Sequence, residues 1–440
     1  MARIVIAGGG VCGLAAGLML HRDGHEVTVL ERDRAPLPES PEDAWERWER
    51  DGVTQFRMAH YLQPLGHGVL GAELPDVLEA LGAPSFDALC MMPPPLAAAG
   101  AREDDERFMT VATRRTTLEL AFGRVAEEEL TILRDTSVVE LLGEPHVRGV
   151  RTSAGDDIDA DLVVDAMGRR SPLPKLLSLP VHEEAEDSGF LYYGRHFRGT
   201  PPQVRGPINM PIGTISILTL PGDDDTWSVT VYTSTGDQPL KRIRDAGRWT
   251  AVVASLPLHA HWLDGEPMTD VVAMGGVVDR YRRLPDGVTG LALLADAFAC
   301  TNPSMGRGIS LGLRHAQLLR DTAREEDPAR FAPAWDQVTE AEVAPWYRDT
   351  VALDRARLHE VEALRNGLPR PRPANPARAA IGPAAMRDPD VFRAMMAHRS
   401  CLGAPSDLDA VGERALELAA DAGPPRLAGP DRDQLLALLS

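Results

Sequence analysis

The stretch Gly8-Gly9-Gly10-Val11-Cys12-Gly13 decides the fold of this chain. It follows a short apolar run, Ile4-Val5-Ile6-Ala7, and precedes a helical pattern, so the order is strand, glycine-rich turn, helix. Gly8 permits a tight turn, Gly10 lets the backbone approach a pyrophosphate, and Gly13 lets the helix pack closely against the strand. The pattern predicts a dinucleotide bound at a helix N-terminus.

An acidic residue after the next strand fits the same interpretation. The run His25-Glu26-Val27-Thr28-Val29-Leu30 ends at Glu31 and Arg32. A carboxylate at this position accepts hydrogen bonds from the adenosine ribose and disfavours a 2′-phosphate. We therefore predict that Glu31 and Arg32 bind the cofactor. A nicotinamide enzyme, or a chance match, would show the same first turn, so this motif alone does not identify the dinucleotide.

A second glycine-containing segment lies far along the chain, and together with the first it favours a flavin. Asp296 closes an apolar strand pattern, Pro303 rigidifies the following loop, and Gly306 and Gly308 free the backbone before a helix that starts at about Ile309. Amides at such a helix start stabilise negative charge on a reduced flavin. As an alternative, Asp296 caps a helix and the glycines only permit a turn. The segment is Asp296-Ala297-Phe298-Ala299-Cys300-Thr301-Asn302-Pro303-Ser304-Met305-Gly306-Arg307-Gly308.

Length and composition indicate a globular protein with more than one lobe. The chain has 440 residues, 44% of them hydrophobic, and 46 Lys and Arg against 65 Asp and Glu. The formal net charge of -19 repels polyanions, so we expect no nucleic-acid partner. Four scattered cysteines without C-x-x-C or metal-ligand spacing predict a cytoplasmic protein with no metal site. We also expect no membrane span, because no apolar run is long enough.

Apolar and alternating runs predict two kinds of sheet. Buried, largely parallel strands are expected at 3–7, 26–30, 161–165 and 291–295. A small antiparallel meander is expected from the runs at 131–134, 138–142, 147–152 and 158–162. Alternating segments at 190–197, 214–220, 227–232 and 271–274 predict an antiparallel sheet that covers the cofactor. The chain after residue 310 has a helical pattern.

The predicted fold class is therefore α/β, with a discontinuous Rossmann-like FAD-binding lobe, an antiparallel-sheet substrate lobe and a helical C-terminal region. We assign residues 1–85, 105–175 and 287–340 to the FAD-binding domain. Residues 86–104 and 176–286 form the predicted substrate domain, and 341–440 the helical region.

With these motifs in this order, residues 1 to about 320 resemble the para-hydroxybenzoate hydroxylase superfamily, the group A FAD-dependent monooxygenases and related FAD-dependent oxidoreductases. The segment from Leu294 to Gly308 resembles the family's Gly-Asp motif, with Ala295 where Gly is usual. The resemblance implies that Asp296 binds the ribityl chain of FAD. A third motif, from Val164 to Pro172, carries Met167 in place of the family's central Asp, which weakens the expectation that NADPH is an efficient reductant.

The resemblance extends to a helix start and to a crossing segment. Arg115 corresponds to an arginine that contacts the cofactor, and its planar fork suits a pyrophosphate, although an exposed arginine could instead be solvated. We also assign Val138 to the cofactor site. His60 ends a segment that crosses near the flavin and is the candidate for proton transfer, with a structural or solvated histidine as the alternative. Candidate substrate contacts are Gln55, Arg57, Tyr193, Arg195 and Met274.

The resemblance implies an FAD-dependent monooxygenase. NADPH or NADH would reduce the flavin, O2 would form a C4a-hydroperoxide, and a small organic substrate, aromatic, polyketide or terpenoid, would be oxidised. Two alternatives remain open: an FAD-dependent oxidase, dehydrogenase or reductase that inserts no oxygen, and a flavin-binding sensor or scaffold. The Trp-x-Trp-x-Ile-Pro signature of flavin halogenases is absent from the sequence.

Overall fold

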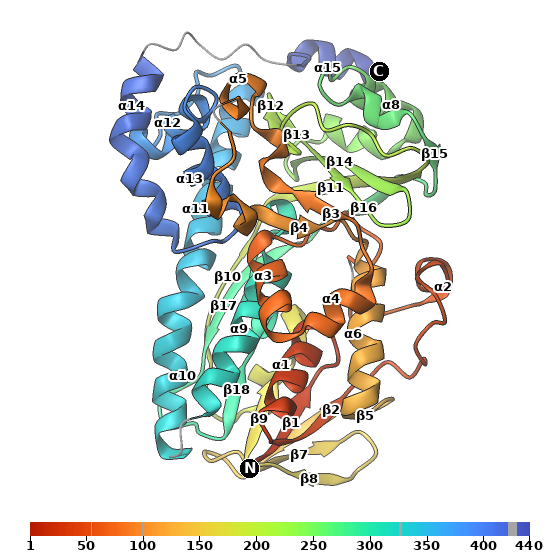
Figure 1. Ribbon diagram of the computed structural model, residues 1–440, viewed down its shortest axis with the longest axis vertical. Coiled ribbons are helices and arrows are strands. Elements are labelled where there is room, and N and C mark those ends of the chain that lie inside the picture. The colour runs from red at the N-terminus through yellow and green to blue at the C-terminus, as the bar shows by residue number, and fades with distance from the viewer. Residues whose placement is uncertain (54, 99, 325–327, 421–428) are drawn as a thin grey trace.

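A five-stranded parallel sheet forms the centre of the cofactor-binding half (Figure 1). The computed structural model describes residues 1–53, 55–98, 100–324, 328–420 and 429–440. Every neighbouring pair of strands in this sheet is parallel, and the central strands are buried on both faces, as their apolar runs predict. In spatial order the strands are β18 (Leu291–Leu293), β9 (Leu162–Asp165), β1 (Arg3–Ala7), β2 (Glu26–Leu30) and β5 (Thr131–Leu133).

Strand β5 corrects the predicted meander. The run at 131–134 was expected to pair antiparallel, but β5 lies parallel to β2 at the edge of the large sheet. The physical reason is the preceding helix α6 (Arg115–Glu129), which carries the chain back along the sheet and so allows a parallel pairing. The antiparallel meander is confirmed for the other three strands, β6 (Val138–Leu142), β7 (Gly149–Thr152) and β8 (Asp157–Asp159).

Helices with small, buried residues pack around this sheet. Helix α1 (Val11–Arg22) contacts α6 on one side and α9 (Gly308–Ala323) on the other. Ala15 and Ala16 of α1 are fully buried, which allows close packing. The helices between β2 and the second lobe are α2 (Pro41–Arg47), α3 (Pro64–Glu73), α4 (Pro75–Leu81) and α5 (Pro94–Ala97), and a short α7 (Leu173–Leu176) follows β9.

The predicted antiparallel sheet is confirmed as the core of the second lobe. Helix α8 (Ala246–Ala254) packs on one face of it, where Trp227 and Trp249 are buried. A separate three-stranded sheet of β10 (His182–Asp187), β17 (Val278–Arg283) and β19 (Ala299–Cys300) joins the two lobes, and β3 (Ser85–Asp87) pairs with β4 (Met109–Val111). The six strands of the larger sheet are β11 (Phe190–Arg198), β12 (Asn209–Ile212), β13 (Ile215–Pro221), β14 (Thr226–Ser234), β15 (Glu266–Pro267) and β16 (Val272–Met274).

The predicted helical C-terminal region is confirmed, and its helices from residue 376 onward lie beside the second lobe (Figure 1); the helix at 328–342 packs against α9 in the cofactor-binding half. The C-terminus lies beside α8, far from the N-terminus at the opposite end of the molecule (Figure 1). None of the described helices has both the length and the apolar character needed to cross a membrane. The domain limits given above stay predictions. The helices are α10 (Pro328–Glu342), α11 (Ala344–Arg365), α12 (Pro376–Ala385), α13 (Pro389–Arg399), α14 (Gly412–Ala420) and α15 (Arg432–Leu438).

Candidate cofactor and substrate site

The three glycines of the first turn differ in what surrounds them. Gly8 has φ +116°, and a Cβ there would lie 2.4 Å from the Ala166 carbonyl oxygen. A Cβ on Gly13 would lie 2.0 Å from the Gly8 oxygen. A Cβ on Gly10 would meet nothing within 4 Å, because Gly10 faces an open cavity. The backbone thus demands glycine at two positions, and the cavity alone accounts for the third.

The two glycine-containing segments meet in one cavity of about 270 Å³, which we call the cofactor cavity. The turn from Gly8 to Gly13 lines it together with Asp296 and Gly308. Helix α1 begins beside it with Gly10 as its N-cap, without a side-chain cap and without an acidic residue in its first turn. The positive end of α1 therefore faces the cavity, as an anion-binding site requires.

Most of the predicted cofactor-binding residues line the cofactor cavity, and two line the space beside it. Pro303 and Gly306 belong to the central cavity described below. Whether each residue contacts a cofactor stays a prediction. Those in the cofactor cavity are Gly8, Gly10, Gly13, Glu31, Arg32, Arg115, Val138, Asp296, Gly308 and Ile309.

A cluster of buried charged residues around Arg50, which was not predicted from the sequence, lies behind the lining of the cofactor cavity. Arg50 donates to Glu31 at 2.8 Å, to Asp33 at 2.7 Å and to Glu119 at 3.0 Å. Glu31 also accepts the Gly9 amide at 3.1 Å, and Glu119 accepts Arg115 Nε at 2.8 Å. One arginine therefore pairs with three carboxylates and holds Glu31 against the turn. Arg50 lies in a run of charged residues, which in sequence looks like an ordinary solvated surface.

A smaller central cavity of about 60 Å³ adjoins the cofactor cavity. Gln55, Arg115, Asp296 and Gly308 line both of them. The prediction that Gln55 lies near the flavin site thus agrees with its position, although contact with a substrate stays a prediction.

His60 lines the central cavity, and its environment keeps it uncharged. Burial, together with the nearby positive charge of Arg115, lowers the pKa of His60 to about 3, so the imidazole is neutral at pH 7. Its Nε2 atom is buried and has no hydrogen-bond partner among the described residues. This atom is therefore available to a ligand, while proton transfer by His60 stays a prediction.

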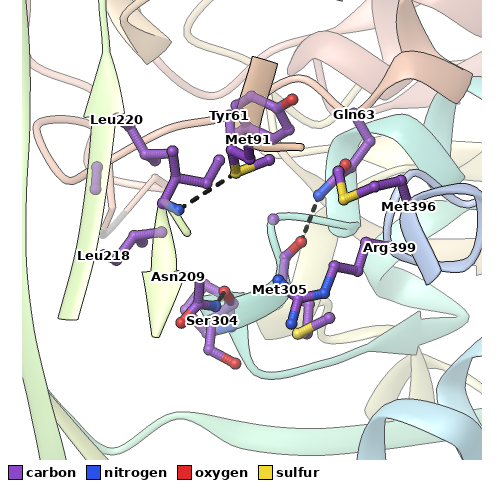
Figure 2. Close-up of a pocket in the computed structure, with 14 residues that line it drawn as sticks. Tyr61, Gln63, Met91, Asn209, Leu218, Leu220, Ser304, Met305, Met396 and Arg399 are labelled. Atoms are coloured by element: carbon purple, nitrogen blue, oxygen red, sulfur yellow. Dashed lines mark hydrogen bonds between the residues drawn. The ribbon is translucent and has the colours of Figure 1, made fainter. Parts of the chain in front are cut away.

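A third cavity, also of about 60 Å³, lies beyond the central one and is the candidate substrate cavity (Figure 2). Ala59, Tyr61, Pro303 and Gly306 line both. Its remaining walls come from β12, β13, α13 and the segment before α5, through side chains that are mostly apolar. These are Gln63, Met91, Ile208, Asn209, Leu218, Leu220, Ser304, Met305, Met396 and Arg399.

Two side-chain amides fix the loop at Pro303–Met305 that separates these cavities. Asn209 donates from Nδ2 to the Ser304 carbonyl at 2.7 Å, and Gln63 donates from Nε2 to the Met305 carbonyl at 2.6 Å (Figure 2). Tyr232 completes the set by donating its hydroxyl to Asn209 Oδ1 at 2.9 Å. The loop is thus held from both the substrate sheet and the cofactor half.

The prediction that Tyr193 and Arg195 face the substrate is wrong. Both point to the opposite face of β11, where Tyr193 packs in the apolar cluster beneath α8 and Arg195 donates to the Thr269 carbonyl at 2.8 Å. The alternation of side chains along a strand turns Tyr192 toward the cofactor half instead. The Tyr192 hydroxyl donates to Asn302 Oδ1, next to Pro303. The sequence showed the alternation but not which face was inward.

Two further predicted substrate contacts lie elsewhere. Arg57 donates to the backbone carbonyls of Trp45, at 2.6 Å, and Trp48, at 2.9 Å, and lines none of the three cavities. It therefore secures a loop. Met274 pairs with Tyr192 across β16 and β11 and packs in an apolar cluster without reaching a cavity. Both Arg57 and Met274 belong to segments that were expected near the cofactor, but their side chains line none of the three cavities.

The motif with Met167 keeps its turn through a different carboxylate. Asp165, at the end of β9, accepts hydrogen bonds from the Ser171 hydroxyl and from the Met167 amide. Burial raises the pKa of Asp165 to about 6. Met167 itself lines the cofactor cavity. The turn is therefore intact, but it presents a thioether where the superfamily presents an acid.

Comparison with known proteins agrees with this geometry. The profile of a family described as pyridine nucleotide-disulphide oxidoreductase matches residues 3–52. The flavin-dependent brominase Bmp2 superposes with a TM-score of 0.63 over 94% of this chain and 98% of that one, at 16% identity. The OxyS anhydrotetracycline hydroxylase of Streptomyces rimosus gives a TM-score of 0.60 over 91% of this chain and 76% of the other, at 18% identity. The chain shares the fold of these two enzymes, as the sequence motifs predicted.

A curated relative has a name that indicates a different reaction. The menaquinone reductase of Mycolicibacterium smegmatis is 25% identical over 368 residues, which cover 76% of this chain and 79% of that protein. The predicted fold is confirmed by these superpositions, and the profile match over residues 3–52 agrees with the prediction of an FAD-dependent oxidoreductase.

Proposed function

We propose that the protein is an FAD-dependent monooxygenase that oxidises a small organic molecule. One observation carries this proposal: the three cavities form a series in which each shares lining residues with the next. Asp296 and Gly308 belong to the cofactor and central cavities, while Tyr61 and Pro303 belong to the central and substrate cavities. A cofactor bound at the glycine turn would thus have its reactive end beside a largely apolar cavity.

The residues of the cofactor cavity fit FAD. Gly10 leaves room for a pyrophosphate at the start of α1, Glu31 offers a carboxylate for the ribose, and Asp296 offers one for the ribityl chain. Amides at the start of α9, from Gly308 and Ile309, favour negative charge on a reduced ring. When bound, FAD supplies electron transfer and the activation of O2.

The protein's own contribution is a largely apolar substrate cavity. Leu218, Leu220 and Met396 present apolar side chains to the space beyond the Pro303 loop, which disfavours water there (Figure 2). Neutral His60, whose buried Nε2 has no hydrogen-bond partner among the described residues, would form a hydrogen bond with a substrate hydroxyl in the central cavity. NADPH or NADH as reductant, O2 as co-substrate and a cytoplasmic location complete the proposal.

A reductase is the second candidate, because the curated relative is named a menaquinone reductase. Met167 also favours it, since it replaces an acid that supports the pyridine nucleotide path in the hydroxylases. A sensor or scaffold is disfavoured, because such a protein needs no substrate cavity beside the flavin site.

The test uses the FAD-loaded protein reduced without oxygen by NADH or NADPH. It is then mixed with 18O2 and a panel of small aromatic compounds, and the products are analysed by mass spectrometry. A monooxygenase incorporates one 18O atom into an organic product. Anaerobic reoxidation by menadione, with no 18O incorporated from any compound, would identify the reductase. Protein that binds no FAD contradicts both candidates.

A further inference from the structure

Arg399 is the single charged side chain among the described residues that line the substrate cavity. It is the last residue of α13 and reaches toward Met305 and Ser304, with Leu218 and Leu220 on the other side of the space (Figure 2). None of the Asp and Glu residues that the structure describes lines this cavity. The cavity is therefore an apolar space with one positive group in its wall.

The Arg399 guanidinium has no ion pair or hydrogen bond with any described residue. This is unusual in the molecule, because each buried arginine of the described chain has a carboxylate partner. Burial lowers the pKa of Arg399; the nearby Tyr232 hydroxyl acts in the opposite direction, and the positive charge of Arg307 lowers the pKa further. A partly buried cation without an anion is costly unless a ligand supplies one. The paired arginines are Arg114, Arg282, Arg307, Arg320 and Arg393.

A structural role at the helix end is the main alternative. A cation in the last turn of a helix interacts favourably with its dipole. Arg365 occupies the same position at the end of α11, but it pairs with Glu362 at 2.9 Å and lines none of the three cavities. The dipole does not explain why the Arg399 side chain lies in a cavity wall between two methionines, Met305 and Met396.

We propose that the substrate carries a carboxylate that pairs with Arg399, while its apolar body lies against Leu218 and Leu220. The proposal rests on the function given above and narrows its substrate to organic acids. A guanidinium presents two parallel N–H donors, which match the two oxygens of a carboxylate. In a chain of formal charge -19, which repels anions as a whole, a local unpaired cation provides the attraction that an acidic substrate needs.

The test compares two probes of the same shape, benzoate and benzamide, on the FAD-loaded protein by isothermal titration calorimetry at pH 7. The pair 2-naphthoate and 2-naphthamide repeats the comparison with a larger body. We expect each carboxylate to bind at least about ten-fold more tightly than its amide, and Arg399→Gln to abolish that preference. Arg399→Lys keeps the charge but loses the fork, so it should retain part of the preference. Arg365→Gln is the matched control and should change nothing.

Three outcomes overturn the inference: no preference for the carboxylates in the wild type, no binding of either carboxylate, or an equal loss of acid and amide in Arg399→Gln. Calorimetry records binding without turnover, so its result is separate from the 18O experiment. Arg399-dependent binding of acids without incorporation of oxygen would refute the proposed reaction and keep the inference. If oxygen is incorporated only into uncharged compounds, and Arg399→Gln does not change this, the proposed monooxygenase reaction is supported and the inference of an acidic substrate is refuted.

Discussion

Among single residues, Gly10 offers the clearest separation of cofactor binding from folding. A Cβ at this position would clash with no protein atom but would occupy the space assigned to a pyrophosphate. We expect Gly10→Ala to weaken FAD binding by at least about ten-fold while the melting temperature of the FAD-free protein stays within a few degrees. Fluorescence titration with FAD and thermal unfolding measure the two effects. Gly68→Ala, in an exposed part of α3 with equally open space, is the control.

Unchanged FAD affinity in Gly10→Ala would place the pyrophosphate elsewhere. Gly13→Ala should behave differently, since its Cβ would overlap the Gly8 carbonyl and disturb the packing of α1 itself. The structure thus agrees with the separate roles that the motif gives to these two glycines: space for a ligand at Gly10 and close packing at Gly13.

From the sequence, the positions where the backbone requires glycine were easier to predict than the partners of charged side chains. The glycines of the first turn were predictable because their steric role is local. Ala295 shows a limit of this: it adopts φ +52°, a left-handed conformation that costs a non-glycine residue about 1 kcal/mol. Arg50 and Arg399 were not predicted, because their significance lies in partners, present or missing, from distant parts of the chain.

At the scale of elements, the periodicity of apolar residues predicted the strands and helices. It did not predict which face of a strand lies against the other lobe. Strand β11 was correctly bounded, yet its inward residue is Tyr192 and not Tyr193. A period of two defines two faces without saying which is covered by the other lobe. Likewise, β5 has the pattern of any short strand, and only its partner β2 assigns it to the parallel sheet.

The turn between the Pro303 loop and α9 depends on one buried arginine. Arg307 is 1% exposed, donates to Asp349 at 2.9 Å and Thr350 at 3.0 Å, and lies 4.8 Å over the Trp346 ring. We expect Arg307→Met to cost about 3 kcal/mol of unfolding free energy, because Asp349 loses a buried partner. It should also weaken FAD binding, since the neighbouring Gly308 lines the cofactor cavity.

Urea unfolding measures the first effect and FAD titration the second. Arg151→Met, which removes an exposed ion pair with Asp157, is the matched control and should lower the unfolding free energy far less than Arg307→Met does. Equal losses in the two variants would contradict a special role for the buried pair.

For the whole molecule, a group of buried carboxylates predicts a dependence of stability on pH. Burial, and then the neighbouring charge of Asp279, raise the pKa of Asp354 to about 7, and burial raises the pKa of Asp279 to about 6. A carboxyl whose pKa is higher in the folded state binds its proton more tightly there. It therefore favours folding at low pH, and this contribution is lost as the pH rises through the folded pKa.

We therefore expect Asp354→Asn to gain stability relative to the wild type between pH 5 and pH 8, by on the order of 2 kcal/mol. The asparagine can still accept the hydrogen bond from Asn302 Nδ2, which spans 3.0 Å to Asp354. Urea unfolding at both pH values checks this, with exposed Asp286→Asn as the control. A difference between wild type and variant that is the same at pH 5 and pH 8 would show that Asp354 does not titrate in this range.

The order of segments around the substrate cavity has a consequence for biosynthesis. Along the chain, the residues that line the substrate cavity run from Ala59 to Arg399. The glycine-rich turn of the cofactor cavity comes before both of them. During translation, the parallel sheet is finished once β18 emerges, whereas α13 leaves the ribosome much later. A nascent chain could therefore bind its flavin before the substrate cavity is complete. A substrate could be bound only after α13 has folded against the rest of the protein.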